Sequence, residues 1–142
     1  MNAGRSVRVV AARAGTPGHP PGRFGPDDCY PVAVWLPILG PAAFVFWRHL
    51  ARQLAHHPDG VTTSLAALAV DLGLGSPHGS QSAVHRTVRR LERFGLLRWV
   101  GDDCLVLSAR LPFVSPAQLA RLAPSVQARH RALRDGASSQ AR

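Results

Sequence analysis

The sequence predicts a mainly helical α+β domain with one small β-hairpin. Apolar residues recur at spacings of three and four around residues 41–57, 64–72 and 80–94, which indicates amphipathic helices. Two apolar runs of strand length then flank the polar tip at residues 101–103, a pattern typical of a hairpin. The 142 residues are enough for one domain with tails, because a domain usually contains ~100–200 residues.

The composition divides the chain into four parts. Residues 1–28 are rich in glycine, proline and small residues, and we expect a flexible basic tail whose removal leaves folding unchanged. Residues 29–114 form the expected domain, and residues 115–135 form the expected C-terminal helices. Residues 136–142 should be disordered, because chain ends fray when nothing holds them.

Residues 30–47 carry no formal charge, and this run approaches the ~20 residues that span a bilayer. Pro31, Pro37 and Pro41 interrupt it. Each proline removes a backbone donor, and a lone helix in lipid has no neighbour to satisfy the carbonyl groups that are set free. We therefore expect no membrane span. We expect a buried extended segment over residues 32–39, followed by a helix that begins at Pro41.

Two helices and a short strand are expected next. The helix after Pro41 ends at the turn Pro58-Asp59-Gly60. Its buried side should carry Phe44, Trp47, Leu50, Ala51 and Leu54. Residues 61–63 are β-branched and suit a short strand, and Thr63 or Ser64 then caps a second helix that ends at Gly73.

The third helix, expected over about residues 80–94, is rich in arginine. Ser80 is its expected cap and Gly95 its end, and its apolar stripe consists of Val84, Val88 and Leu91. At ~100° per residue, four side chains lie opposite that stripe and two more flank them. The four are Ser82, Arg86, Arg89 and Arg93, and the flanking pair is His85 and Arg90.

The remaining elements are a hairpin and two C-terminal helices. Residues 96–100 and 104–107 are the expected strands of the hairpin. Ser115-Pro116 should open a fourth helix, and Pro124 should open a fifth.

This order of helix, short strand, two helices and hairpin resembles the winged helix-turn-helix regulators of bacteria. The segments that carry the resemblance are LAALAVDLGLG, SAVHRTVRRLERFGLLRWV and the hairpin after them, about half the chain. In VRRLERFGLLRWV an arginine-rich helix ends at a glycine and leads directly into a strand. This resembles the junction between the recognition helix and the wing in that family. The resemblance implies a winged helix and double-stranded DNA as its partner.

A second resemblance lies nearer the N-terminus. The stretch VWLPILGPAAFVFWRHLA is similar to a run in small uncharacterised proteins of high-GC bacteria, and this similarity implies no function. Such a genome also explains why the 17 basic residues are all arginine. The net charge of +9 therefore indicates a partner only through the arginines that share a folded face.

The third helix offers the candidate DNA contacts. A helix fits the major groove of B-DNA, and the planar fork of arginine bonds guanine edges or phosphates. Residues near the helix start should approach bases, namely Gln81, Ser82, His85 and Arg86. Residues further along should meet the backbone, namely Arg89, Arg90 and Arg93.

The wing is expected to contribute through Arg98 and Arg110, which could contact the DNA backbone. Its tip departs from the family pattern. Asp102 and Asp103 would be repelled by phosphate oxygens, so contacts by the tip itself are not expected.

No catalytic, metal or cofactor site is expected. A nucleophile needs a base and an orienting group, and most of the acidic residues lie at turns or in tails. Cys29 and Cys104 have no second thiol nearby, so they form no zinc or redox motif and indicate free thiols in a reducing cytosol. His56 and His57 are adjacent, and on a helix they point ~100° apart and do not chelate a metal together.

We therefore expect a non-enzymatic transcription regulator that binds DNA in the cytoplasm, at the nucleoid, as a homodimer formed through its C-terminal helices. One alternative is a winged-helix interaction module whose basic face docks an acidic protein. Another is a replication or partition protein of a mobile element. The arginine alignment favours the regulator, whereas the acidic hairpin tip favours the interaction module.

Overall fold

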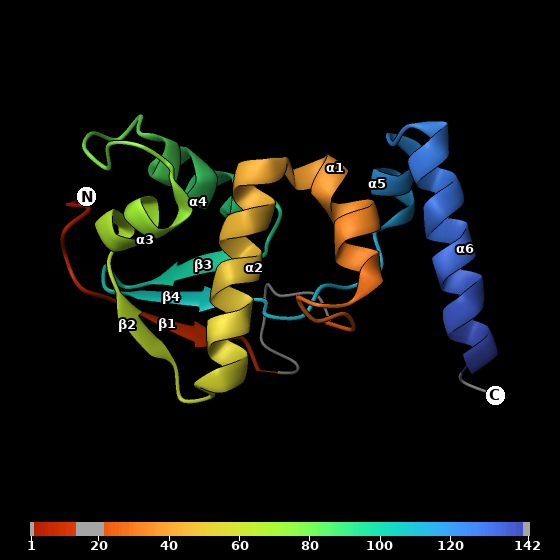
Figure 1. Cartoon of the computed structure of the whole chain (residues 1–142), viewed down its shortest axis with the longest axis horizontal. Coiled ribbons are helices and arrows are strands. Elements are labelled where there is room, and N and C mark those ends of the chain that lie inside the picture. Colours follow the sequence, from red (N-terminus) through yellow and green to blue (C-terminus); the bar gives the residue numbers. More distant parts are fainter. Residues whose placement is uncertain (1, 14–21, 141–142) are drawn as a thin grey trace.

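The computed structural model describes residues 2–13 and 22–140, and for residues 137–140 the backbone alone. This part of the chain is a mixed α+β fold, as predicted, with a four-stranded sheet. Helix α2 (Pro41–His56) crosses in front of the sheet, and α3 (Leu65–Leu72) and α4 (Ala83–Arg93) lie at one end of it (Figure 1).

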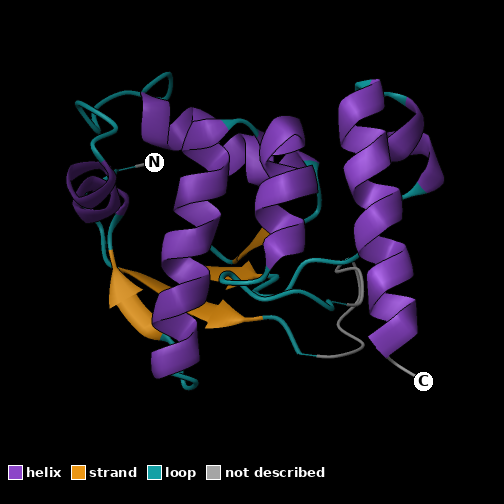
Figure 2. Ribbon diagram, turned by 45° about the vertical axis from the view of Figure 1, so that its right-hand side comes forward, coloured by secondary structure: helices purple, strands orange, loops and turns teal. Residues whose placement is uncertain are grey.

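The other helices lie on the far side of α2. The π-helical turn η1 (Pro31–Trp35) and α1 (Leu36–Leu39) come first, followed by the short helix α5 (Pro116–Ala120). Helix α6 (Pro124–Gln140) lies beside η1 and away from the sheet (Figures 1 and 2). None of the helices in the described part of the chain is both long and apolar enough to cross a bilayer.

The sheet contains a strand that the sequence did not predict. Its order is β2-β1-β4-β3, so β1 (Val7–Ala11) lies inside the sheet. β1 pairs antiparallel with β2 (Val61–Thr63) and parallel with β4 (Cys104–Leu107). The predicted hairpin is confirmed as β3 (Leu97–Val100) paired with β4.

The prediction of a flexible tail over residues 1–28 was therefore wrong for residues 2–13, and it was also wrong for residues 22–28, where Phe24 forms a β-bridge with Leu111. Val7 and Val9 are 3% and 0% exposed, whereas Arg8 between them is exposed. This alternation is the pattern of a half-buried strand. Gly60, at φ 111°, fits the tight turn before β2, because a β-carbon there would lie 2.9 Å from the carbonyl oxygen of Val9. Residues 14–21 of the expected tail lie outside the described residues.

The segment over residues 32–39 is buried in part, as predicted, but it is helical rather than extended. The backbone N–H of Leu36 bonds the carbonyl of Pro31, which makes η1 one wide turn, and α1 continues from it to Gly40. Pro31 and Pro37 lie in the first turns of η1 and α1, where a missing backbone donor costs little. Gly40, at φ 83°, separates α1 from the predicted start of α2 at Pro41.

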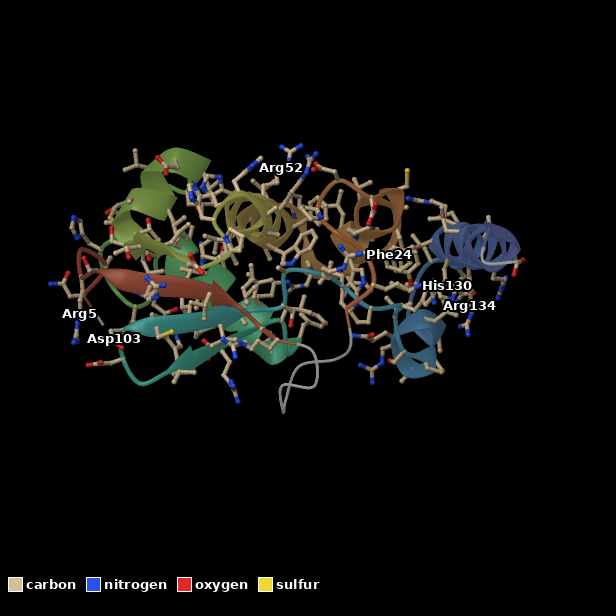
Figure 3. All side chains as sticks on the ribbon, turned by 90° about the horizontal axis from the view of Figure 1, so that it is seen from below. Arg5, Phe24, Arg52, Asp103, His130 and Arg134 are labelled. Atoms are coloured by element: carbon tan, nitrogen blue, oxygen red, sulfur yellow. The ribbon has the colours of Figure 1, made fainter. Side chains whose placement is uncertain are left out.

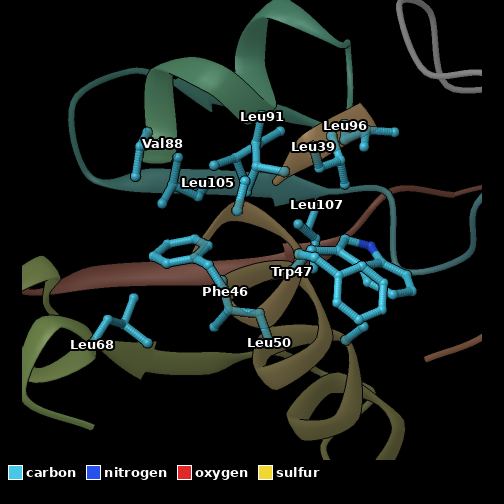
Figure 4. Close-up of a cluster of buried hydrophobic side chains, with 14 of the residues drawn as sticks. Leu39, Phe46, Trp47, Leu50, Leu68, Val88, Leu91, Leu96, Leu105 and Leu107 are labelled. Atoms are coloured by element: carbon cyan, nitrogen blue, oxygen red, sulfur yellow. The ribbon is translucent and has the colours of Figure 1, made fainter. Parts of the chain in front are cut away.

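The apolar side of α2 is buried as predicted and forms the middle of the core. Figure 4 shows Phe46, Trp47 and Leu50 of α2 packed between α4 and the sheet. Val88 and Leu91 meet them from α4, and Leu105 and Leu107 meet them from β4. The indole Nε1 of Trp47 donates to the carbonyl of Ser108 at 2.8 Å.

Two serines cap the helices at the end of the sheet. The Oγ of Ser64 accepts the N–H of Ala67 at 3.0 Å, which confirms the predicted cap of α3. Gly73 ends α3 in a left-handed conformation, as predicted. The cap of α4 is Ser82 rather than Ser80, so a loop over residues 73–82 joins the two helices.

The C-terminal helices begin at Pro116 and Pro124, as predicted. Ser115 and Gln118 form a reciprocal capping box at the start of α5. α6 continues to Gln140, so the expected disorder from residue 136 is wrong for residues 136–140. Residues 141 and 142 lie outside the described residues.

Candidate nucleic-acid interface

α4 is held in the core by its apolar stripe and presents arginine on the other side. Val84, Val88 and Leu91 are at most 3% exposed. Arg86 and Arg93 are exposed, as the helical spacing predicts. The sequence of an amphipathic helix thus fixes which side of α4 faces the solvent.

Arg89 is exposed as well, but it also supports the loop before α4. Its Nη1 donates to the carbonyl of Ser80 at 2.7 Å, which holds the loop against the helix. Gln81 lies exposed in the same loop. Both side chains therefore lie near the start of α4, where the candidate base contacts were expected.

Ser82 and His85 have internal roles that the helical projection did not predict. The Oγ of Ser82 accepts the backbone N–H of His85 and lies 2.6 Å from its ring Nδ1. His85 is 9% exposed. The pair closes the N-terminus of α4, so we remove both residues from the candidate DNA contacts.

Arg90 is exposed, but its guanidinium group connects α4 to α1. Its Nε donates to the carbonyl of Leu39 at 2.5 Å, and its Nη2 donates to the carbonyl of Ile38 at 2.8 Å. These carbonyls belong to the last residues of α1, whose C-terminal end attracts a cation. The guanidinium group also lies 5.6 Å from the ring centroid of Phe94. We therefore assign Arg90 a structural role.

A hollow of about 240 Å³ lies between the starts of α2 and α4. Arg86 and Arg90 line it, together with residues 39–43. The N-terminus of α2, a helix of 16 residues, carries the positive end of the helix dipole. The potential around Arg86 is therefore positive from two sources.

The hairpin tip is partly neutralised by a residue that the sequence analysis did not single out. The Nη1 of Arg5 lies 2.8 Å from the Oδ2 of Asp102, and both side chains are exposed. The backbone N–H of Arg8 donates to the carbonyl of Asp103. Figure 3 shows Arg5 and Asp103 at the same end of the molecule. One of the two tip carboxylates is thus paired with an arginine.

The two arginines predicted for the wing have different positions. Arg98 is exposed on β3. Arg110 follows the sheet, and its Nη2 donates to the carbonyl of Arg23 at 2.6 Å. Arg110 therefore connects two loops and is not a residue of the wing.

Metal ligands do not gather in the described residues: no three His, Cys, Asp or Glu side chains there lie close enough to hold an ion. The chain matches no known protein family, no characterised protein and no solved structure.

Proposed function

We propose that the chain binds double-stranded DNA, with α4 in the major groove and the β3–β4 hairpin as the wing of a winged helix. The observation that carries this proposal is the exposed row of Arg86, Arg89 and Arg93 on a helix whose opposite side is buried. Three guanidinium groups on one rigid face suit a row of phosphates and base edges.

The dimensions of α4 support this proposal. Its 11 residues give a helix about 16 Å long, and a helix fits the width of the major groove. Arg86 is near the helix start and beside the N-terminus of α2, so it is the residue that we assign to a base edge or a deep phosphate. Arg93 is in the last turn, and we assign it to a backbone phosphate.

The acidic hairpin tip favoured the interaction module, and the ion pair between Arg5 and Asp102 weakens that support. An acidic tip would be repelled by DNA, but a paired carboxylate repels phosphate much less. Within this proposal the protein is a transcription regulator, and a homodimer through the C-terminal helices would place two copies of α4 on one duplex.

The test is fluorescence anisotropy with random GC-rich duplex DNA at several salt concentrations. We expect the affinity to fall steeply with salt, by a slope of about 0.9 for each phosphate contact. The double variant Arg86→Gln/Arg93→Gln should lose most of the affinity. The matched control is Arg121→Gln/Arg131→Gln, which removes the same charge from exposed positions in or beside the C-terminal helices. Because the proposed homodimer uses these helices, size-exclusion chromatography checks that the control variant has the oligomeric state of the unaltered protein.

Equal losses in the two double variants would mean that only net charge matters, and the assignment to α4 would fail. If the unaltered protein binds no DNA at low salt, the proposal as a whole is wrong. Binding to an acidic protein, lost in Arg86→Gln/Arg93→Gln, would then support the interaction module instead.

A further inference from the structure

A second basic site lies on α2, on the side that faces away from the sheet. Five basic side chains line a hollow of about 430 Å³ there: Arg48, His49, Arg52, His56 and His57. Figure 3 shows Arg52 pointing away from the sheet. The spacing of four residues between Arg48, Arg52 and His56 places these side chains on neighbouring turns of the helix.

Two side-chain nitrogen atoms of residues that line this hollow are buried without a hydrogen-bond partner among the described residues. They are the Nε of Arg48 and the Nε2 of His49. A buried polar atom without a hydrogen bond is costly, so a water molecule or ligand that bonds it would stabilise the protein. Both side chains line the hollow.

Two arginines that line the hollow, Arg48 and Arg52, also hold the carboxylate of Asp27. Its Oδ1 accepts bonds from the Nε and Nη2 of Arg52 at 2.9 and 2.6 Å and lies 3.5 Å from the Nη2 of Arg48. The hydrogen bond from Arg52 is the main cause that lowers the pKa of Asp27, so the carboxylate is ionised at neutral pH. One carboxylate thus faces two guanidinium groups, so one positive charge remains in excess.

We propose that this hollow binds a phosphate monoester of a small organic molecule. The excess positive charge of the two arginines favours an anion, and the three oxygens of a phosphate monoester can accept hydrogen bonds from arginine and histidine at once. Val45, which is 47% exposed, and Leu72 of α3 line the same hollow and offer apolar surface to the organic part of the ligand. The volume lies within the ~300–1,000 Å³ of small-molecule sites.

This inference does not rest on DNA binding by α4, because the two sites share no residue. The probe for the test is phenyl phosphate, with inorganic phosphate and phenol as comparison ligands, titrated into the full chain by isothermal calorimetry. We expect saturable binding of phenyl phosphate at one site. Inorganic phosphate should bind at least about fivefold more weakly, because it lacks the apolar part, and phenol should not bind measurably.

Two variants should weaken the binding of phenyl phosphate by about tenfold each, Arg48→Gln and His49→Gln. A third variant should act in the opposite direction. Asp27→Asn removes the carboxylate that competes for both arginines, so phenyl phosphate should bind several-fold more tightly. The control Arg131→Gln, which alters an exposed arginine of α6, should leave the affinity unchanged.

Circular dichroism should be recorded for each variant to test whether it is folded. If Arg48→Gln is misfolded, His49→Gln and Asp27→Asn remain independent tests. The proposal is overturned if neither the unaltered protein nor Asp27→Asn binds phenyl phosphate at millimolar concentration. It is also overturned if Arg48→Gln weakens duplex DNA binding as much as Arg93→Gln does. The basic residues that line the hollow would then belong to a nucleic-acid surface.

Discussion

The hydroxyl group of Tyr30 lies 2.8 Å from the Nδ1 of His130 and joins the start of η1 to α6. The same hydroxyl accepts the backbone N–H of Val114 at 3.0 Å. Its single proton can therefore be donated to His130 when Nδ1 is unprotonated. The neutral imidazole with its proton on Nε2 fits this bond, and the phenol then both accepts from Val114 and donates to His130.

Lowering the pH should destabilise the protein through His130. Burial is the main cause that lowers the pKa of this group below 6.5, and the charges of Arg134 and Arg131 lower it further. The unfolded chain then takes up a proton at a higher pH than the folded protein does. The stabilisation is complete above pH 6.5 and is lost as the pH falls from there towards the folded pKa.

Thermal unfolding between about pH 7.5 and 5.5 measures this effect. The melting temperature of the unaltered protein should fall across this range, and that of His130→Gln should fall less. His78→Gln, which changes an exposed loop histidine, is the control and should behave like the unaltered protein. A fall of the same size in His130→Gln would show that other groups cause it.

The N-terminal strand should be essential for stability. Val9 is fully buried in the middle of the sheet, so Val9→Ala should lower the free energy of unfolding by about 2 kcal/mol. Removal of residues 1–13 should abolish the folded state, because β2 and β4 would lose their common neighbour. Chemical denaturation followed by circular dichroism measures both effects.

Val32→Ala, at a position that is 50% exposed, is the control and should change stability by less than about 0.5 kcal/mol. An unchanged midpoint on removal of residues 1–13 would restore the interpretation of this segment as a tail.

β1 shows why the sequence was sufficient for the later elements but not for this one. The helices α2, α3 and α4 and the hairpin have long periodic patterns, local caps and local turns, and all were predicted. β1 has only two inward valines beside a stretch rich in glycine and proline, and its partners lie far along the chain at Thr63 and Leu105. The helical segment at residues 31–39 was missed for a related reason. Its prolines favour an extended chain unless each one lies in the first turn of a helix. The local sequence does not reveal where those first turns are.

The candidate site on α4 was also predictable only where local pattern decides the position of a side chain. The periodicity of α4 predicts that Arg86 and Arg93 face outward, because burial of Val84, Val88 and Leu91 fixes the rotation of the helix. It does not reveal the role of Arg90, whose acceptors are carbonyls about fifty residues earlier in the chain. Arg90 lies between the buried and the exposed face of α4. The partner of such a side chain depends on tertiary packing, which the helical pattern does not contain.

Arg90→Ala should therefore reduce stability more than any other substitution of an arginine on α4. It leaves the carbonyls of Ile38 and Leu39 without this charged donor, and we expect a loss of about 1–3 kcal/mol. Arg93→Ala, at an exposed position in the same helix, should change stability by less than about 0.5 kcal/mol. Urea titration of both variants makes the comparison, and equal stabilities would contradict the structural role of Arg90.

The last prediction separates the two kinds of DNA contact that we propose for α4. Arg86→Ala should cost about 1–3 kcal/mol of binding on a selected site and relax the sequence preference at one position, because a base edge loses its donor. Arg93→Ala should weaken binding to selected and random duplexes alike and reduce the salt slope by about one, because one phosphate contact is lost. Both variants should unfold at the same temperature as the unaltered protein, since both side chains are exposed. Anisotropy titrations on a selected site and on random duplexes, each at several salt concentrations, measure these quantities.

Val88→Asp is the control for loss of fold, because it buries an unpaired charge next to α2 and should abolish folding and binding together. If Arg86→Ala and Arg93→Ala change both duplexes equally, α4 contacts phosphates only, and the assignment of Arg86 to a base edge is wrong.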